Sequence, residues 1–450
     1  MDKPLILRPP HCDPLHLLRE LKGNYPYCAL LESADRAHGV NDLSFLALGA
    51  KEVIKTSGSD PLKPFEKLVK TGRAKGQLHM GYIGFLSYES VRFFDEVNLP
   101  AEESTPDGLF FLPEVLLRID HKNRTVTVNT NDEVDLSKII QAIESSPFLD
   151  DSLEKKVEIK LPLTLEEIAP LRMTKREEYC ASVEKIQESI LAGEAFQVVL
   201  SQELTFTAEA TALDTYRELR RINPSPYMYF FQSPEQTIVG ASPETLIRVD
   251  GGEMLYRPIA GTRKRTGDEK ADAEMQQELL HDEKECAEHQ MLVDLGRNDL
   301  GRIAEIGSVR VSNPFHIEKY AHVFHLVSDI TATLRKDLTS LDAVRAVFPA
   351  GTLSGAPKLR AMEIIREREV SPRGVYGGAF GYIDLSGNLD FAITIRTLIF
   401  RGKEVSLRVG AGIVRDSVPE LEDNECLHKA RSCLAAVRAA SSSPLIPCAR

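Results

Sequence analysis

Two acidic stretches carry the residue spacing with the clearest chemical meaning. Glu285 and Glu288 lie three positions apart in the run from Asp282 to Leu295, whose apolar residues recur at a helical period. Residues three apart are neighbours on one helix face, so the two carboxylates repel unless a cation lies between them. A hard cation with oxygen ligands, such as Mg²⁺, is the natural partner. The alternative is a solvated acidic face with no ligand.

The last helical stretch repeats this arrangement. Glu422, Glu425 and Lys429 fall at i, i+3 and i+7 on one face, opposite Leu427. If the two helices met, they would supply carboxylates from both sides of a divalent ion. We therefore consider a Mg²⁺ site that binds an anionic substrate, with Arg396 and Lys429 as candidate counter-ions. A solvated face is again the alternative.

Composition limits the partners. The chain has 450 residues and a net charge of −12, and no basic stripe interrupts its acidity, so we expect no nucleic-acid partner. An anionic substrate must then be met by local cations. The seven cysteines form no CxxC pair, a usage typical of a reducing cytoplasm. We find neither a signal peptide nor an apolar run approaching the ~20 residues of a membrane span, and expect a cytoplasmic protein without a membrane partner.

The elements that must position these residues indicate an α+β fold. Helices are expected at 14–21, 174–193, 269–296 and from 420; strands are expected at 27–33, 80–88, 115–120, 125–129, 195–201, 229–231, 237–241, 245–249, 376–384, 389–400 and 405–414, the last broken at Gly410. The length favours two domains, at 1–150 and 171–440 with a polar linker between about 145 and 170, or one large interleaved domain.

Three patterns of glycines or nucleophiles favour no site on their own. The run from Gly351 to Lys358 has the wrong spacing for a phosphate loop, and Pro357 removes an amide donor. Gly410-Ala411-Gly412 lacks the third glycine of a dinucleotide fingerprint, and alone it favours a bulge over a site. No Gly-x-Ser-x-Gly or Gly-x-Cys-x-Gly run occurs, so the chain has no recognisable hydrolase or glutaminase nucleophile.

Four long runs carry a resemblance to the chorismate-utilising enzymes: residues 257–263, 282–302 (DEKECAEHQMLVDLGRNDLGR), 348–358 (FPAGTLSGAPK) and 409–417. Together they cover most of 171–440. The N-terminal third also resembles the family, through residues 30–33 and 81–92, and the whole chain is similar to a short anthranilate synthase component I. The resemblance implies a large α/β sandwich with mainly antiparallel sheets enclosing the active site.

Two positions bear on the branch of the family. Isochorismate and salicylate synthases carry a water-activating lysine where this chain has Gln197, so Gln197 resembles the ammonia-using branch. Many aminodeoxychorismate synthases carry a nucleophilic lysine where this chain has Ala260. The resemblance therefore implies direct amination of chorismate to anthranilate with release of pyruvate. Aminodeoxychorismate synthase component I, of the 4-aminobenzoate pathway, is the near alternative; a non-catalytic amino-acid-binding regulator is the alternative of another class.

The resemblance also implies roles for individual residues. Glu288 and Glu425 would be Mg²⁺ ligands, with Glu285 and Glu422 close by. Glu244 would be the general acid for the departing hydroxyl, and His325 would handle the proton in the second step; a packed core histidine is the alternative for His325. The catalytic set is Glu244, His325, Glu285 and Thr262, and the substrate-binding set is Gly261, Thr262, Tyr376, Arg396, Gly410, Ala411, Gly412 and Lys429.

A second site and a second subunit are implied as well. Leu31-Glu32-Ser33 and the run from Asn223 to Met228 resemble the tryptophan feedback pocket of anthranilate synthases, with Ser33, Pro226, Tyr227 and Met228 as inhibitor contacts. Two loops that merely pack together are the alternative. Ammonia would come from glutamine through a separate glutaminase subunit, in a heterodimer or heterotetramer.

Overall fold

The computed structural model describes residues 4–33, 43–69, 80–97, 99, 105–130, 134–146, 163–320, 323–441 and 443–448, so most of the expected linker lies outside the described residues. The described helices are α1 (Pro14–Leu21), α2 (Ser137–Glu144), α3 (Leu165–Ile168), α4 (Arg176–Leu191), α5 (Ala212–Ile222), α6 (Glu269–His281), α7 (Glu283–Gly301), α8 (Ser340–Val347), α9 (Gly351–Ser354), α10 (Lys358–Arg368) and α11 (Pro419–Ala440).

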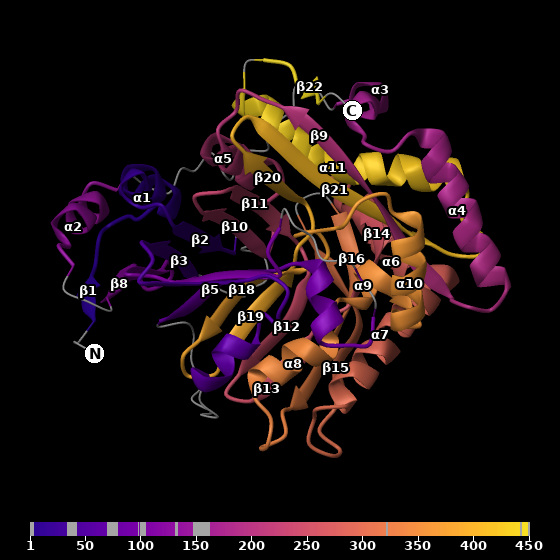
Figure 1. Ribbon diagram of the computed structural model, residues 1–450, viewed down its shortest axis with the longest axis horizontal. Helices are drawn as coiled ribbons and strands as arrows, with labels where there is room; N and C mark the ends of the chain where they lie inside the picture. The colour runs from indigo at the N-terminus through magenta and orange to yellow at the C-terminus, as the bar shows by residue number, and fades with distance from the viewer. Residues whose placement is uncertain are drawn as a thin grey trace.

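Two large sheets form the body of the molecule (Figure 1). The 12-stranded sheet runs in the order β1 (Leu5–Leu7), β8 (Thr125–Thr130), β7 (Val115–Asp120), β3 (Leu43–Leu48), β2 (Cys28–Glu32), β10 (Tyr227–Gln232), β11 (Thr237–Ser242), β20 (Thr397–Arg401), β21 (Glu404–Ile413), β9 (Gln197–Thr207) and β17 (Gly355–Ala356), with β22 (Ile446–Pro447) also on β9. The 10-stranded sheet runs in the order β14 (Ile259–Lys264), β16 (Val323–Thr333), β13 (Glu253–Tyr256), β12 (Thr245–Asp250), β19 (Leu389–Ile393), β18 (Ala379–Asp384), β5 (Gly81–Leu86), β6 (Gly108–Leu112) and β4 (Glu52–Thr56), with β15 (Arg310–Lys319) also on β16.

The described strand pairs are antiparallel, so the expected α+β fold with mainly antiparallel sheets is confirmed. Strands from both ends of the chain share both sheets. In the larger sheet β2 pairs with β10, and in the smaller sheet β5 pairs with β18. The segments 1–150 and 171–440 are therefore joined by backbone ladders in the larger and the smaller sheet alike.

The strand period places successive side chains of the larger sheet on opposite faces. In β2, Cys28 and Leu30 belong to one apolar core and Ala29 to another. The first core lies between the larger sheet and helices that include α4, α5 and α11. The second fills the space between the two sheets and extends to α7 and α8. The larger sheet is therefore buried on both faces, which explains the long apolar runs of its strands.

The chain crosses between the sheets at two adjacent points. It leaves β11 and enters β12 through Pro243-Glu244, and it leaves β19 and enters β20 through residues 394–396. The amide of Ile393 donates to the Glu244 carbonyl at 3.0 Å, and the amide of Ala241 donates to the Arg396 carbonyl at 3.2 Å. The expectation of one strand over 389–400 is therefore wrong, because the second half of that run pairs with β11 in the other sheet.

Two further expectations need correction. The acidic helix expected over 269–296 is two helices, because Asp282 has an extended backbone and its side chain accepts from the amide of Glu285 at 3.0 Å, which caps α7. The strand over 405–414 is not broken at Gly410, since β21 keeps an unshifted register with β9 throughout. Within the described ranges, no helix has both the length and the apolar character that a bilayer crossing demands.

Candidate active site

The acidic faces of α7 and α11 lie close to each other. Glu288 is half-buried among acidic groups, and its pKa is raised by desolvation and by the charges of Glu285 and Glu425. The pKa of Glu422 is raised by burial and by Glu425, while Lys284 of α7 opposes that rise. Two helices that are far apart in sequence thus influence each other's carboxylates, as the hypothesis of a shared Mg²⁺ site requires.

These carboxylates have the donor chemistry of a Mg²⁺ site. Among the described residues, no three His, Cys, Asp or Glu side chains form a complete metal cage. Mg²⁺ commonly uses only one or two protein carboxylates and completes its shell with water and substrate oxygens. Mutual repulsion already disfavours ionisation of Glu288 beside Glu285 and Glu425. A divalent cation would remove that repulsion, so the residues present fit the ion.

The glycines of β21 leave room for polar side chains beside Glu288. A Cβ on Gly412 would lie 2.6 Å from Gln197 Nε2, and that nitrogen donates to Glu288 Oε1 at 3.0 Å. A Cβ on Gly410 would lie 2.7 Å from the hydroxyl oxygen of Tyr376. Ala411, between them, directs its methyl group into the core on the opposite face. Only the backbone of Ala411 is therefore available to the site.

Lys429 connects α11 to this strand. Its Nζ donates to the Gly410 carbonyl at 2.9 Å and pairs with Glu425 Oε1 at 2.8 Å. The ammonium therefore lies between β21 and Glu425, and it partly neutralises the charge of Glu425. This arrangement joins Tyr376, Gly410 and Lys429 into one wall of the site.

A second wall comes from β14 and β16. His325 Nδ1 lies 3.0 Å from the Thr262 hydroxyl oxygen and 3.2 Å from the Gly261 carbonyl oxygen. Because a carbonyl only accepts, Nδ1 carries the proton and Nε2 is left as the basic nitrogen. Burial, with the charge of Arg396, lowers the pKa of His325 to about 4, so the ring is neutral. Gly261 also lies next to Glu285, since a Cβ on Gly261 would lie 3.2 Å from Glu285 Oε2.

Glu244 and Arg396 project from the two crossings between the sheets. Burial raises the pKa of Glu244 to about 7, against the opposing charges of Lys429 and Arg396. The guanidinium of Arg396 makes no hydrogen bond or ion pair with the described residues, and burial lowers its pKa. A desolvated guanidinium without a partner is a ready site for a ligand carboxylate.

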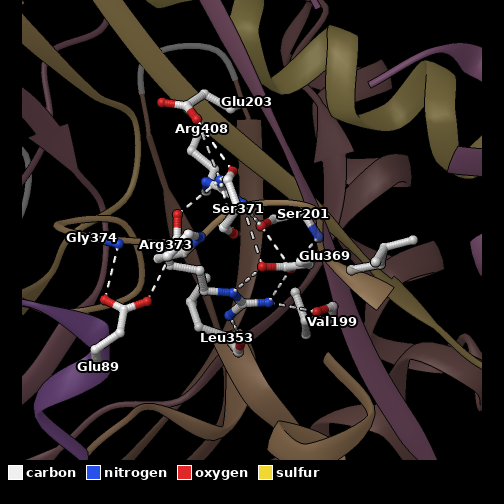
Figure 2. Close-up of polar contacts among 12 residues, drawn as sticks. Glu89, Val199, Ser201, Glu203, Leu353, Glu369, Ser371, Arg373, Gly374 and Arg408 are labelled. Atoms are coloured by element: carbon white, nitrogen blue, oxygen red, sulfur yellow. Dashed lines mark hydrogen bonds and ion pairs between the residues drawn. The ribbon is translucent and has the colours of Figure 1, made fainter. Parts of the chain in front are cut away.

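No sequence pattern indicated two contacts that support this site. The Thr352 hydroxyl donates to Glu244 Oε1 at 2.8 Å, although the two residues are 108 positions apart. Arg373 lies in a buried polar network (Figure 2), where it pairs with Glu369 and donates to the carbonyls of Leu353 and Val199. The run FPAGTLSGAPK was a signal for Thr352, but only as part of a family motif; no spacing rule indicated Arg373.

The residues expected to bind an inhibitor gather elsewhere, along β2 and β10. Met228 pairs with Glu32, the residue before Ser33, and Pro226 directly precedes β10. The Tyr227 hydroxyl donates to Asp390 at 2.9 Å and lies 2.9 Å from the hydroxyl oxygen of Thr245. Thr245 follows Glu244 in the chain, so this second group of residues reaches the strand that carries the candidate acid.

Comparison with known proteins defines the class. The model of the chorismate binding enzyme family matches residues 26–435, and the chain therefore belongs to that family. Anthranilate synthase component 1 of Mycolicibacterium smegmatis is 41% identical over 468 residues, covering 95% of this chain and 89% of the relative. Its counterpart in Aquifex aeolicus is 36% identical over 476 residues, covering 96% and 93%.

Solved structures agree. The crystal structure of anthranilate synthase component I from Streptococcus pneumoniae matches with a TM-score of 0.73 and 36% identity, over 87% of this chain and 92% of that one. The menaquinone-specific isochorismate synthase of Escherichia coli matches with a TM-score of 0.74 at 21% identity, over 97% and 94%, which shows the shared fold alone. The chain is a chorismate-utilising enzyme with the sandwich fold that its motifs predicted.

Proposed function

We propose that this chain is the large subunit of an anthranilate synthase, which converts chorismate and ammonia to anthranilate and pyruvate in the presence of Mg²⁺. The observation that carries the proposal is the amide of Gln197. Its Nε2 is held by Glu288, while its Oε1 is buried and has no hydrogen-bond partner among the described residues. A buried acceptor without a donor costs free energy, and an incoming ammonia molecule would satisfy it.

Substrate binding follows from the charges of the site. The guanidinium of Arg396 suits a two-point grip on the enolpyruvyl carboxylate of chorismate. Glu288 and Glu425, with Glu285 and Glu422 nearby, would hold Mg²⁺, which supplies a positive charge for the ring carboxylate and for the charge that develops during reaction. Lys429 adds a second positive charge on the same side, since its ammonium is anchored to the Gly410 carbonyl.

Amination needs an acid and an unhindered nucleophile. Ammonia bonds to the ring carbon next to the one that bears the carboxylate, the ring double bonds shift, and the carbon–oxygen bond of the 4-hydroxyl breaks. Glu244 gives its proton to the departing oxygen, which leaves as water, and the new ammonium group releases one proton in return. Ala260 has only a methyl group and cannot serve as a covalent nucleophile, which favours direct attack by ammonia.

The second step makes the ring aromatic. The aminated carbon loses its proton, the bond from the ring to the enolpyruvyl oxygen breaks, and the enolpyruvyl methylene carbon gains a proton to give pyruvate. Neutral His325 has its free Nε2 lone pair available for the ring proton, with Nδ1 held by the Gly261 carbonyl. The Thr262 hydroxyl, which also contacts Nδ1, helps to fix the orientation of the His325 imidazole.

The deciding experiment supplies purified chain with chorismate, Mg²⁺ and ammonium at alkaline pH and follows anthranilate fluorescence. The chain has no tryptophan, so the protein background is low. Joint, Mg²⁺-dependent appearance of anthranilate and pyruvate is the expected result. Chorismate consumption without anthranilate, with 4-aminobenzoate formed only after addition of an aminodeoxychorismate lyase, would instead assign the 4-aminobenzoate pathway. A chain that consumes no chorismate even with a glutaminase subunit would be a regulator.

The proposal extends to supply and control. Ammonia would be delivered by a glutaminase subunit in a cytoplasmic heterodimer or heterotetramer, and glutamine should replace ammonium once that subunit is added. L-Tryptophan would inhibit by binding at Ser33, Pro226, Tyr227 and Met228. The support is the adjacency of β2 and β10, which places the two matching segments side by side.

A further inference from the structure

The short helix α9 presents a hydroxyl group to the candidate acid. The Thr352 Oγ1 donates to Glu244 Oε1 at 2.8 Å, and Glu244 itself is only 7% exposed. The other carboxyl oxygen, Oε2, has no hydrogen bond to the described residues. The two oxygens of one carboxyl group are thus chemically distinct in this structure.

This difference decides where the acidic proton resides. In a protonated carboxyl group, the carbonyl oxygen accepts hydrogen bonds and the hydroxyl oxygen donates. Among the described residues the Thr352 hydroxyl has no other acceptor, so it donates to Oε1 and leaves Oε2 as the oxygen that carries the acidic proton. We propose that Thr352 is a positioning residue that fixes the transferable proton of Glu244 on Oε2. The inference rests on the proposed function, because it assigns Glu244 its role as acid in the amination step.

The backbone that carries the Thr352 side chain is held in place by several contacts. The amides of Leu353 and Ser354 donate to the Ala350 carbonyl at 3.0 and 3.1 Å, which closes the turn of α9. Arg373 donates to the Leu353 carbonyl directly after Thr352 (Figure 2), and the side chain of Arg373 is 1% exposed. The turn also packs tightly on α7, since a Cβ on Gly351 would lie 2.2 Å from a methyl group of Leu295. Thr352 therefore has a fixed backbone.

The charged groups around Glu244 do not provide this selection. Lys429 approaches from α11, Arg396 from the second crossing between the sheets, and the Tyr256 hydroxyl from β13. Lys429 and Arg396 favour the ionised carboxylate as a whole, and no hydrogen bond joins either of them to one Glu244 oxygen. Among the described side chains, only Thr352 is hydrogen-bonded to the Glu244 carboxyl group. The hydroxyl of Thr352 therefore distinguishes Oε1 from Oε2.

The test compares Thr352→Val, which keeps the shape but loses the donor, with Thr352→Ser, which keeps the donor. General acid catalysis contributes about 10²–10⁴-fold, so a misplaced proton should lower kcat for anthranilate formation on the order of tenfold in Thr352→Val, with little change in KM for chorismate. Thr352→Ser should retain most of the activity. Loss of the donor also raises the pKa of Glu244, so the alkaline limb of kcat should move to higher pH in Thr352→Val when rates are expressed per free ammonia.

Two controls separate positioning from structural damage. Pyruvate loss from a supplied aminated cyclohexadiene intermediate needs no proton from Glu244, so Thr352→Val should perform that half reaction at the rate of the unaltered chain. In a Glu244→Gln background, adding Thr352→Val should cause no further loss of the residual rate, because the two residues act as one unit. Equal damage by Val and Ser, an unmoved alkaline limb, or additive losses would each overturn the inference. Failure of the unaltered chain to make anthranilate would instead overturn the proposed function.

Discussion

Arg373 offers the sharpest test of how the site is supported. Its side chain is 1% exposed and that of its partner Glu369 is 4% exposed, and the two are linked by hydrogen bonds of 2.7 and 2.9 Å. The guanidinium also lies 4.5 Å from the ring centre of Tyr88 and 5.6 Å from that of Tyr376. A change at Arg373 would therefore affect both the stability of the fold and the Tyr376 wall of the site.

The perturbation is Arg373→Met, which keeps length and apolar bulk but removes the charge. Breaking a buried ion pair from one side costs about 3–5 kcal/mol, because the remaining charge stays buried without its partner. Arg408, 3.4 Å from Glu369, supplies part of the lost compensation, so we expect about 3 kcal/mol. The matched control is Lys185→Met, whose partner Glu188 is on the surface with side-chain exposures of 54% and 65%, and which should cost about 0.5 kcal/mol or less.

Urea denaturation provides the assay, followed by far-ultraviolet circular dichroism and by tyrosine fluorescence, since the chain has no tryptophan. Coincident transitions by both probes license a comparison of unfolding free energies. The pH dependence of the free energy of unfolding provides an independent check on the role of Glu369. Burial opposes ionisation of Glu369, but Arg373 and Arg408 hold its pKa below the ordinary 4.5. The stabilisation from ionised Glu369 is therefore present above pH 4.5 and is lost as the pH falls through the lower pKa that Glu369 has in the folded state. A destabilisation below about 1 kcal/mol for Arg373→Met would refute this account.

The other predictions concern activity. Gly412→Ala puts a Cβ 2.6 Å from Gln197 Nε2 and should displace the amide, raising KM for ammonium on the order of tenfold in ammonium titrations; an unchanged KM would argue against an ammonia site at Gln197. Glu288→Gln removes a charge from the acidic pair and should raise the Mg²⁺ concentration for half-maximal activity on the order of tenfold or more, with an unchanged circular dichroism spectrum. Ser33→Phe should relieve inhibition by tryptophan in dose–response curves, and undiminished inhibition would count against the β2–β10 pocket.

Local patterns predicted the parts of this fold that local interactions decide. The helix over 14–21, the hairpin of β7 and β8, and the strand pair of β18 and β19 each depend on neighbouring residues, and each is present. The break at Asp282 was also readable, because an aspartate followed three positions later by a glutamate is a helix start signal. The helical period of the apolar residues continues on both sides of Asp282, and by itself it predicts one helix over 269–296.

The features that local sequence patterns did not predict depend on pairing between distant segments of the chain. Residues 389–400 alternate as one strand would, yet β19 pairs with β12 while β20 pairs with β11. Only the partners reveal that the chain changes sheets at Arg396. The contact of Thr352 with Glu244 and the network of Arg373 likewise join segments without any shared periodicity. Sequence could therefore assign the two acidic helix faces, but not the groups that contact and orient Glu244.

The crossings between the sheets explain why one feature of the fold serves two chemical needs. Burial at these points raises the pKa of Glu244 to about 7 and lowers that of Arg396, so it disfavours both charges. An anionic substrate held by Arg396, as proposed, would restore a counter-charge to the guanidinium. The same negative charge, placed near Glu244, would further disfavour ionisation of Glu244 and would keep that carboxyl group protonated. In the proposed mechanism, substrate binding and protonation of Glu244 would therefore reinforce each other, because the two groups come from hydrogen-bonded crossings of the same pair of sheets.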